Sequence, residues 1–177
     1  MNKFYSDNII FFDTEFTNLD IEKGELLSIG LVKNNGKKLY LEFKYEGKDI
    51  HPWVKKKVLP YLKGKKISLE KGREKIWDFV GRNNKEKPFL MAYVNQFDAM
   101  YWYKIFGDPQ KHPAFWIPID FASILFAYGY SPESPRYKKF YDELGLNSTK
   151  YQDHNALEDA LKLRDIYNAF VKKVKDD

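Results

Sequence analysis

Three features of the 177-residue sequence indicate an α/β domain with a mixed β-sheet. Short apolar or alternating segments fill the first 45 positions, with turn residues between them, as in an antiparallel three-strand meander. Helical and strand-like segments then alternate, which is typical of parallel strands joined through helices. A long amphipathic segment closes the chain and predicts a helix that packs on the sheet.

The meander is expected within residues 9–45. Residues 9–12 are fully apolar and predict a central buried strand that ends at Asp13. Residues 25–32 and 38–45 predict the second and third strands. Asn-Asn-Gly at 34–36 predicts a tight hairpin between these two strands, because Asn-Gly tolerates the positive φ that such turns need.

Helices and parallel strands are expected to alternate beyond the meander. Asp120 is placed to cap the helix that follows the last of these strands. The elements before Asp120 are, in chain order, a helix over 52–62 that breaks at Pro60, a helix over 69–80, a strand over 88–94, a helix over 97–106 and a strand over 115–119.

The rest of the chain predicts one loop and one long helix. Ser-Pro-Glu-Ser-Pro at 131–135 is expected to be a loop. Apolar residues recur at helical spacing over about 154–174, so this segment predicts the helix that packs on the sheet. The sequence contains no repeat, linker or low-complexity segment, and we expect a single domain over residues 1–177.

The composition favours a nucleic-acid partner. The net charge of +5 and the pI near 9.1 suit a polyanion, because basic surface attracts phosphates. The absence of cysteine excludes disulfides and thiolate zinc sites. We find neither a signal peptide nor a stretch of about 18 apolar residues, so we expect a soluble cytoplasmic protein.

Acidic residues follow two of the predicted strands. Asp13 and Glu15 are two positions apart, so on a strand their side chains share a face. Asp98 follows the predicted strand over 88–94 and opens a helix. Carboxylates gathered at one point need divalent cations between them, and such a cluster suits phosphodiester hydrolysis with two metal ions. Taken alone, Asp98 is equally consistent with an acid that stabilises a helix N-terminus.

His154 and Asp159 stand at the predicted start of the last helix. Five residues turn a regular helix by about 500°, so the two side chains converge only if His154 lies at or before the helix start. Asp153 is a suitable N-cap at this point. A histidine in a loop can deprotonate an attacking water. The alternative is a capped helix start with an exposed histidine.

The order of these motifs resembles the DEDDh family of 3′-to-5′ exonucleases. The shared pattern is Asp-x-Glu on the first strand, an Asp at a strand-to-helix junction, and a final His-x4-Asp, over residues 11 to about 167. A related class carries Tyr four residues before the last Asp. This chain has Asn155 there, which favours the histidine class. The resemblance implies a ribonuclease H-like fold.

Four segments look most like the bacterial polyadenylate-specific exoribonuclease AS group: residues 12–16, 25–30, 53–60 and 154–160. The segment over 53–60, Trp-Val-Lys-Lys-Lys-Val-Leu-Pro, discriminates best, because the general superfamily lacks it. This resemblance implies a homodimer that acts on single-stranded RNA and prefers adenylate tracts. It also implies that two Mg²⁺ ions, replaceable by Mn²⁺, are bound by four carboxylates, those of Asp13, Glu15, Asp98 and Asp159. In the same resemblance, His154 is the general base.

Three further residues are candidate substrate contacts. Phe16 and Thr17 follow Glu15, where members of the family contact the terminal nucleotide. Phe16 is equally consistent with packing in the core. Asn95 is expected to orient the backbone or to contact substrate. The lysine-rich stretch over 55–66 either follows the phosphate backbone or is a solvated helix face and loop.

The leading prediction is a metal-dependent 3′-to-5′ exoribonuclease that releases nucleoside 5′-monophosphates from single-stranded RNA. A first alternative is a 3′-to-5′ DNA exonuclease of repair or proofreading, because the same site accepts both sugars. A second is a catalytically silent nucleic-acid-binding module of the same fold. Retention of all five site residues argues against the silent module.

Overall fold

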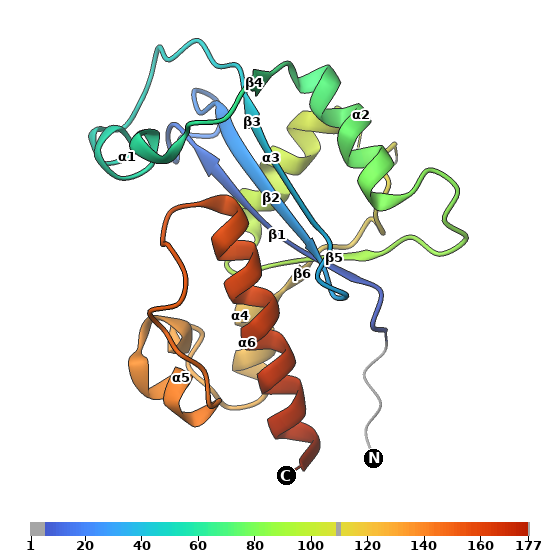
Figure 1. Ribbon diagram of the computed structural model, residues 1–177, viewed down its shortest axis with the longest axis vertical. Helices are drawn as coiled ribbons and strands as arrows, with labels where there is room; N and C mark the ends of the chain where they lie inside the picture. Colours follow the sequence, from blue (N-terminus) through green and yellow to red (C-terminus); the bar gives the residue numbers. More distant parts are fainter. Residues whose placement is uncertain (1–5, 109–110, 177) are drawn as a thin grey trace.

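A six-stranded mixed β-sheet forms the centre of the computed structural model, which describes residues 6–108 and 111–176. The strands lie in the order β4-β3-β2-β1-β5-β6 (Figure 1). β1, β2 and β3 pair antiparallel, whereas β4, β5 and β6 join their neighbours in parallel. The predicted mixed sheet with its three-strand meander is therefore confirmed. The strands are β1 (Ile9–Phe16), β2 (Leu26–Lys33), β3 (Lys38–Phe43), β4 (Lys66–Ile67), β5 (Phe89–Ala92) and β6 (Ile119–Asp120).

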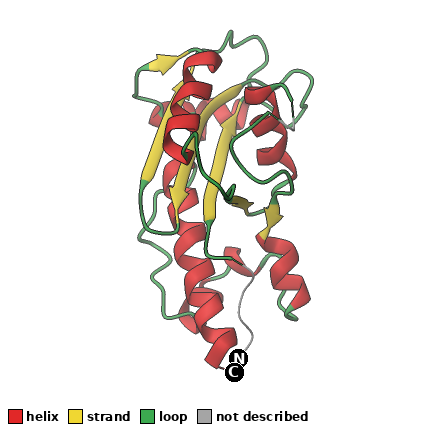
Figure 2. Cartoon of the chain, turned by 90° about the vertical axis from the view of Figure 1, so that its right-hand side faces the viewer, coloured by secondary structure: helices red, strands yellow, loops and turns green. Residues whose placement is uncertain are grey.

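Helices cover both faces of this sheet (Figures 1 and 2). Residues of α2 and α3 share one apolar core with the sheet, and residues of α4, α5 and α6 share the other. None of the helices in the described part of the chain has the length and apolarity needed to cross a membrane. The helices are α1 (Pro52–Lys57), η1 (Leu59–Tyr61), α2 (Leu69–Val80), α3 (Gln96–Phe106), α4 (Phe121–Ala127), η2 (Ser134–Arg136), α5 (Lys138–Glu143) and α6 (Ala156–Asp176).

β1 separates the two cores and carries the first acidic motif between them. Its side chains alternate, so Ile10 and Phe12 pack with α2 and α3, and Phe11 packs with α4, α5 and α6. The same alternation places Asp13 and Glu15 on the α6 face. The strand was expected to end at Asp13 but continues to Phe16, because its pairing with β2 continues. Both acids are therefore fixed by the sheet.

Several boundaries differ from the sequence-based prediction. β3 ends at Phe43 instead of residue 45. β5, predicted over 88–94, ends at Ala92, two residues before Val94 takes a left-handed φ of 60°. The predicted break at Pro60 separates α1 from the 3-10 turn η1. Helix α2 spans residues 69–80 as predicted, between the Ser68 cap and Gly81.

The strand predicted over 115–119 was wrong, the predicted loop contains a 3-10 turn, and two elements were missed. Residues 115–118 lie outside the sheet, where Pro118 has no N–H to give to a strand partner, and of this segment only Ile119 and Asp120 pair with β5, as β6. The expected loop at 131–135 tightens into η2 at residue 134. Helix α5 and strand β4 were not predicted, because six and two residues are too few to show a period.

Gly30 lets α6 approach the sheet beside the acidic motif. It pairs with Asp13 across β1 and β2. A Cβ built on Gly30 would lie 2.2 Å from the carbonyl oxygen of Ala156, the first residue of α6. Only glycine leaves room for this contact, so the start of α6 lies against β2 at Gly30, next to Asp13 on β1.

Candidate functional site

Three carboxylates meet where β1 passes beneath the first turn of α6. One oxygen each from Asp13, Glu15 and Asp159 lies within 4.8 Å of the other two. Asp13 and Glu15 project from the same face of β1, and Asp159 comes down from α6. This oxygen-only donor set is the kind that Mg²⁺ and Mn²⁺ prefer. The three residues fit the predicted divalent cations.

Asp98 lies beside this group but is held by a hydrogen-bonded neighbour. It is in the first turn of α3 and is buried. Its Oδ1 accepts hydrogen bonds from the backbone N–H of Thr14 (2.8 Å) and from Thr14 Oγ1 (2.7 Å). Its charge raises the pKa of Asp13 and of Glu15, so it faces the same site. Sequence reasoning missed Thr14, which links the strand that carries the acids to α3.

The four carboxyl groups hold protons more tightly than isolated acids do. Burial, followed by repulsion from neighbouring carboxylates, raises the pKa of Glu15 to about 8 and that of Asp13 well above its ordinary value. Burial raises the pKa of Asp98 to about 7, against the hydrogen bonds from Thr14. Burial also raises the pKa of Asp159 to about 6, against the nearby charge of Lys162. Such a cluster is ready to exchange protons for divalent cations near neutral pH.

His154 lies just before α6, and Asp159 lies within it, as their convergence requires. The His154 backbone is left-handed (φ 63°), and its N–H donates to Asp159 Oδ2 at 3.0 Å. The predicted Asp153 cap was wrong. The Asn155 side chain accepts from the backbone N–H groups of residues 157 and 158, and Asp153 instead forms an ion pair with Lys162 at 2.9 Å. The reason is geometric, since the left-handed turn at His154 leaves Asn155 as the residue that begins the helix.

The imidazole of His154 is positioned by α1. The ring of Trp53 meets it edge to face, with centroids 4.6 Å apart and planes at 83°. Burial lowers the pKa of His154 below its usual value, and Lys57 and Lys162 act in the same direction against Asp153. The neutral imidazole, which can accept a proton, is therefore favoured near pH 7.

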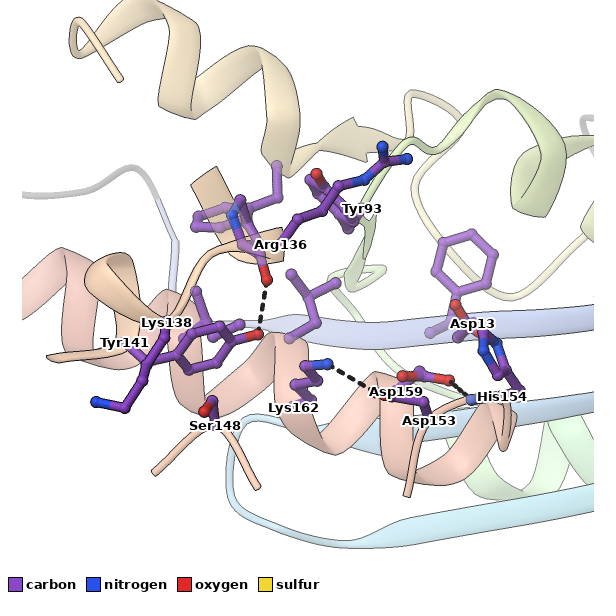
Figure 3. A pocket seen from close by; sticks show the side chains of 15 residues that line it. Asp13, Tyr93, Arg136, Lys138, Tyr141, Ser148, Asp153, His154, Asp159 and Lys162 are labelled. Atoms are coloured by element: carbon purple, nitrogen blue, oxygen red, sulfur yellow. Dashed lines mark hydrogen bonds and ion pairs between the residues drawn. The ribbon is translucent and has the colours of Figure 1, made fainter. Parts of the chain in front are cut away.

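Two cavities open on either side of the carboxylates. Both are lined by Asp13, Tyr93, His154 and Asp159, which form their shared wall. The first has a volume of about 560 Å³ and also contains Glu15, Asp98, Thr14, Asn18 and His51 in its lining. It is here called the apolar cavity for its remaining lining residues, Phe16, Leu19, Trp53, Val54, Val94 and Phe97. The second has a volume of about 570 Å³ and is here called the cationic cavity for Arg136, Lys138 and Lys162 (Figure 3). Its lining is completed by Asp153, Ser148, Tyr141 and the apolar residues Phe12, Phe121, Pro135, Leu163 and Ile166.

The three predicted substrate contacts are placed differently from one another. Phe16 lines the apolar cavity, and its ring stacks on that of Tyr101 with centroids 4.6 Å apart. The buried Thr17 hydroxyl accepts a hydrogen bond from the N–H of Glu25. The buried Asn95 donates through its side chain to the carbonyl oxygen of Ile119. Neither Thr17 nor Asn95 lines a cavity, so both lie behind the site.

Two further features near the site are the lysines of α1 and the backbone of Val94. Lys55, Lys56 and Lys57 are exposed on α1, outside the lining of either cavity. Val94, which sequence reasoning missed, lines the apolar cavity with a left-handed φ of 60°. That conformation is strained for a β-branched residue, and such strain concentrates at functional sites. No feature of the sequence signals it.

No protein-family model and no curated protein matches the sequence, but solved structures match the fold. A 3′-exonuclease that recognises the 3′ end of the histone mRNA stem-loop aligns with 93% of this chain and 81% of its own, with a TM-score of 0.70 and 13% identity. The zinc-bound complex of E. coli ExoI with single-stranded DNA aligns with 94% of this chain at a TM-score of 0.63 and 15% identity. This chain covers only 40% of that ExoI chain.

A third match is a chain from the structure of the yeast NOT1 MIF4G domain co-crystallised with CAF1. It aligns with 93% of this chain and 80% of its own length, with a TM-score of 0.58 and 13% identity. Identities this low establish the arrangement of strands and helices and nothing about activity. The chain has the ribonuclease H-like fold found in these 3′-exonucleases.

Proposed function

We propose that this protein is a divalent-metal-dependent exoribonuclease that degrades single-stranded RNA from its 3′ end and releases nucleoside 5′-monophosphates. The observation that carries the proposal is the meeting of Asp13, Glu15 and Asp159 within 4.8 Å, with Asp98 and a neutral His154 beside them. Carboxylates in this arrangement serve to hold divalent cations for phosphodiester hydrolysis. The fold shared with solved 3′-exonucleases supports the same reaction class.

The apolar cavity suits the terminal nucleoside. Its volume of about 560 Å³ lies within the range of small-molecule sites. Trp53 and Phe97 offer aromatic surface to a base, and base stacking on such surface contributes roughly 1–3 kcal/mol. A nucleoside in this cavity places its 5′ phosphate against the shared wall of carboxylates. The substrate is then held by its end.

The chain's own groups provide for the proton transfer. The neutral His154 imidazole accepts a proton from the attacking water, and the contact with Trp53 fixes its orientation. Water oxygen bonds to the phosphorus while the bond to the 3′ oxygen of the preceding nucleotide breaks. The products are a 5′-monophosphate and a strand shorter by one residue. Divalent cations on the four carboxylates would neutralise the charge that develops on the phosphate and its leaving oxygen.

The choice of RNA, the preference for adenylate tracts, the homodimer and the cytoplasmic location rest on the resemblance of the four sequence segments to the polyadenylate-specific group. RNA is distinguished from DNA by a contact to the 2′-hydroxyl. Sedimentation of the purified protein tests the dimer. The substrate preference is tested together with the reaction itself.

The decisive experiment uses homopolymer RNA and DNA oligonucleotides labelled at either end, incubated with Mg²⁺, Mn²⁺ or EDTA. We expect 5′-labelled RNA to shorten one nucleotide at a time, 3′-labelled RNA to release labelled mononucleotide, and EDTA to stop both. Faster cleavage of DNA would select the DNA exonuclease instead. Metal binding by calorimetry without cleavage of any substrate would select the silent binding module.

A further inference from the structure

The cationic cavity lies on the far side of the carboxylates from the apolar cavity and is unlike it in chemistry. Arg136 at the end of η2, Lys138 at the start of α5 and Lys162 on α6 bring three positive charges to its lining (Figure 3). The shared wall of carboxylates adjoins them. A polyanion that reaches the carboxylates from this side would therefore pass the three cations.

The two peripheral cations are available to a ligand. Arg136 pairs with Glu133 at 2.9 Å and Lys138 pairs with Asp142 at 2.7 Å, and all four side chains are more than half exposed. Exposed pairs of this kind contribute little to stability and exchange readily. Releasing Arg136 or Lys138 to a phosphate therefore costs the fold little.

Lys162 has a different place. It is mostly buried, pairs with Asp153 at 2.9 Å, and lowers the pKa of Asp13 and Asp159. Its ammonium group also lies 5.9 Å from the centre of the Tyr141 ring. Lys162 therefore lies against the shared wall, whereas Arg136 and Lys138 form the outer part of the cationic cavity.

We propose that the cationic cavity binds the RNA strand on the 5′ side of the scissile phosphate, with Arg136 and Lys138 against backbone phosphates of different nucleotides. This inference rests on the proposed exonuclease function. A terminal nucleoside in the apolar cavity leaves the rest of the strand to cross the shared wall, and the cationic cavity opens there. Arg136 extends alongside Tyr93, the aromatic member of that wall (Figure 3). Its planar guanidinium can pair with two phosphate oxygens at once.

The charge distribution supports this division of the substrate. Where no cations are bound, the ionised carboxylates repel an RNA strand, and the lining of the apolar cavity contains no lysine or arginine to offset this. Lysine and arginine side chains supply the sequence-independent part of nucleic-acid affinity. The cations of this cavity thus provide the attraction that the apolar cavity lacks, and they act on strand affinity rather than on the bond-breaking step.

The test compares two substrates in three variants. Arg136→Gln and Lys138→Gln each remove one cavity charge, and Lys139→Gln removes a matched exposed charge from the same helix outside the cavity lining. The substrates are an adenylate oligonucleotide and the p-nitrophenyl ester of adenosine 5′-monophosphate, which carries no 5′ strand. Thermal melting of each variant shows that it is folded.

We expect Arg136→Gln and Lys138→Gln to raise KM for the oligonucleotide several-fold. Both variants should hydrolyse the ester at close to the wild-type rate, and Lys139→Gln should leave the oligonucleotide reaction unchanged. Fluorescence anisotropy with labelled RNA in EDTA gives an independent reading. Each backbone phosphate that a variant no longer neutralises should reduce the slope of log affinity against log salt by about 0.7. Lys139→Gln should leave this slope at the wild-type value.

Three results would overturn the inference. The first is an unchanged KM and salt slope in both cavity variants. The second is an equal fall in oligonucleotide and ester hydrolysis, which would indicate a damaged catalytic centre. The third is a larger effect on inhibition by adenosine 5′-monophosphate than on RNA affinity, which would make the cavity a product site. If the wild type cleaves neither substrate, the proposed function fails, and the salt slope still decides whether the cavity binds RNA.

Discussion

The apolar and cationic cavities share one wall and differ in almost everything else. The apolar cavity is built around the end of β1 and the helices α1 and α3, and it combines aromatic and aliphatic side chains with Glu15 and Asp98 but contains no lysine or arginine. The cationic cavity is built by η2, α5 and α6, and it carries arginine and lysine. The sheet fixes the wall between them, while short peripheral elements determine what each cavity can recognise. Under the proposed function, the shared wall carries the chemistry and the side chains around it carry substrate recognition.

The largest effect is expected from breaking the shared wall. Asp13→Asn keeps the shape of the side chain and removes a charge from the three-carboxylate group, so we expect cleavage to be abolished and cation affinity to fall. The fold should persist, because the change also relieves repulsion among buried carboxylates. Activity assays and metal titration by calorimetry measure the two losses. Wild-type turnover in a folded Asp13→Asn protein would contradict the assignment of Asp13 to the catalytic site.

The second effect comes from the proton acceptor in the same wall. We expect His154→Ala to reduce kcat by about 10²–10⁴-fold, the usual contribution of a general base, and to leave cation affinity nearly unchanged. The wild-type rate should rise with pH as the imidazole loses its proton, and the variant should lack this rise. A dominant loss of metal binding would instead make His154 a ligand.

The third effect separates the apolar cavity from the wall. Trp53→Ala should reduce kcat/KM roughly tenfold, because the terminal base no longer stacks on the indole and His154 is less ordered. Tyr61→Ala is a matched control, because Tyr61 is equally exposed at 45% but lies outside the lining of both cavities. An RNA whose last nucleotide has no base should be cleaved more slowly by the wild type and equally by Trp53→Ala. Equal sensitivity of both proteins would leave no role for Trp53.

The smallest effect concerns stability and its dependence on pH. The folded pKa of Glu15 is about 8 against an ordinary 4.5, so between these pH values the folded protein binds more protons than the unfolded chain. Stability in EDTA should therefore be highest near pH 4.5 and fall as the pH rises to 8. Mn²⁺ should restore the melting temperature at pH 8 and change it little at pH 5. A melting temperature in EDTA that is higher at pH 8 than at pH 5 would contradict the raised pKa values.

The sequence predicted the elements whose pattern repeats or whose ends are marked. Residues 9–12 are apolar throughout, Asn-Gly marks the hairpin, and Ser68 and Gly81 enclose α2. The strand predicted over residues 115–119 was wrong. Phe, Trp and Ile favour strands, but Pro118 cannot donate to the hydrogen-bond ladder of a sheet. Helix α5 and strand β4 left no period to detect.

The candidate site was predictable to the extent that it follows motifs in the chain. Asp13 and Glu15 follow from alternation on a strand, and the convergence of His154 with Asp159 follows from helical geometry. The cationic cavity was not predictable, because its members come from three separate elements that only the fold brings together. The left-handed backbone conformation of Val94 was not predictable either, because a β-branched residue normally avoids that conformation.

The contact between Gly30 and the start of α6 gives the site an order of assembly. Asp13, Glu15 and Asp98 belong to the part of the chain that leaves the ribosome first, whereas His154 and Asp159 are made at least 50 residues later. These two reach the earlier carboxylates only when α6 settles on Gly30. If the protein is a ribonuclease, a nascent chain is inactive toward its own message until α6 has emerged and docked.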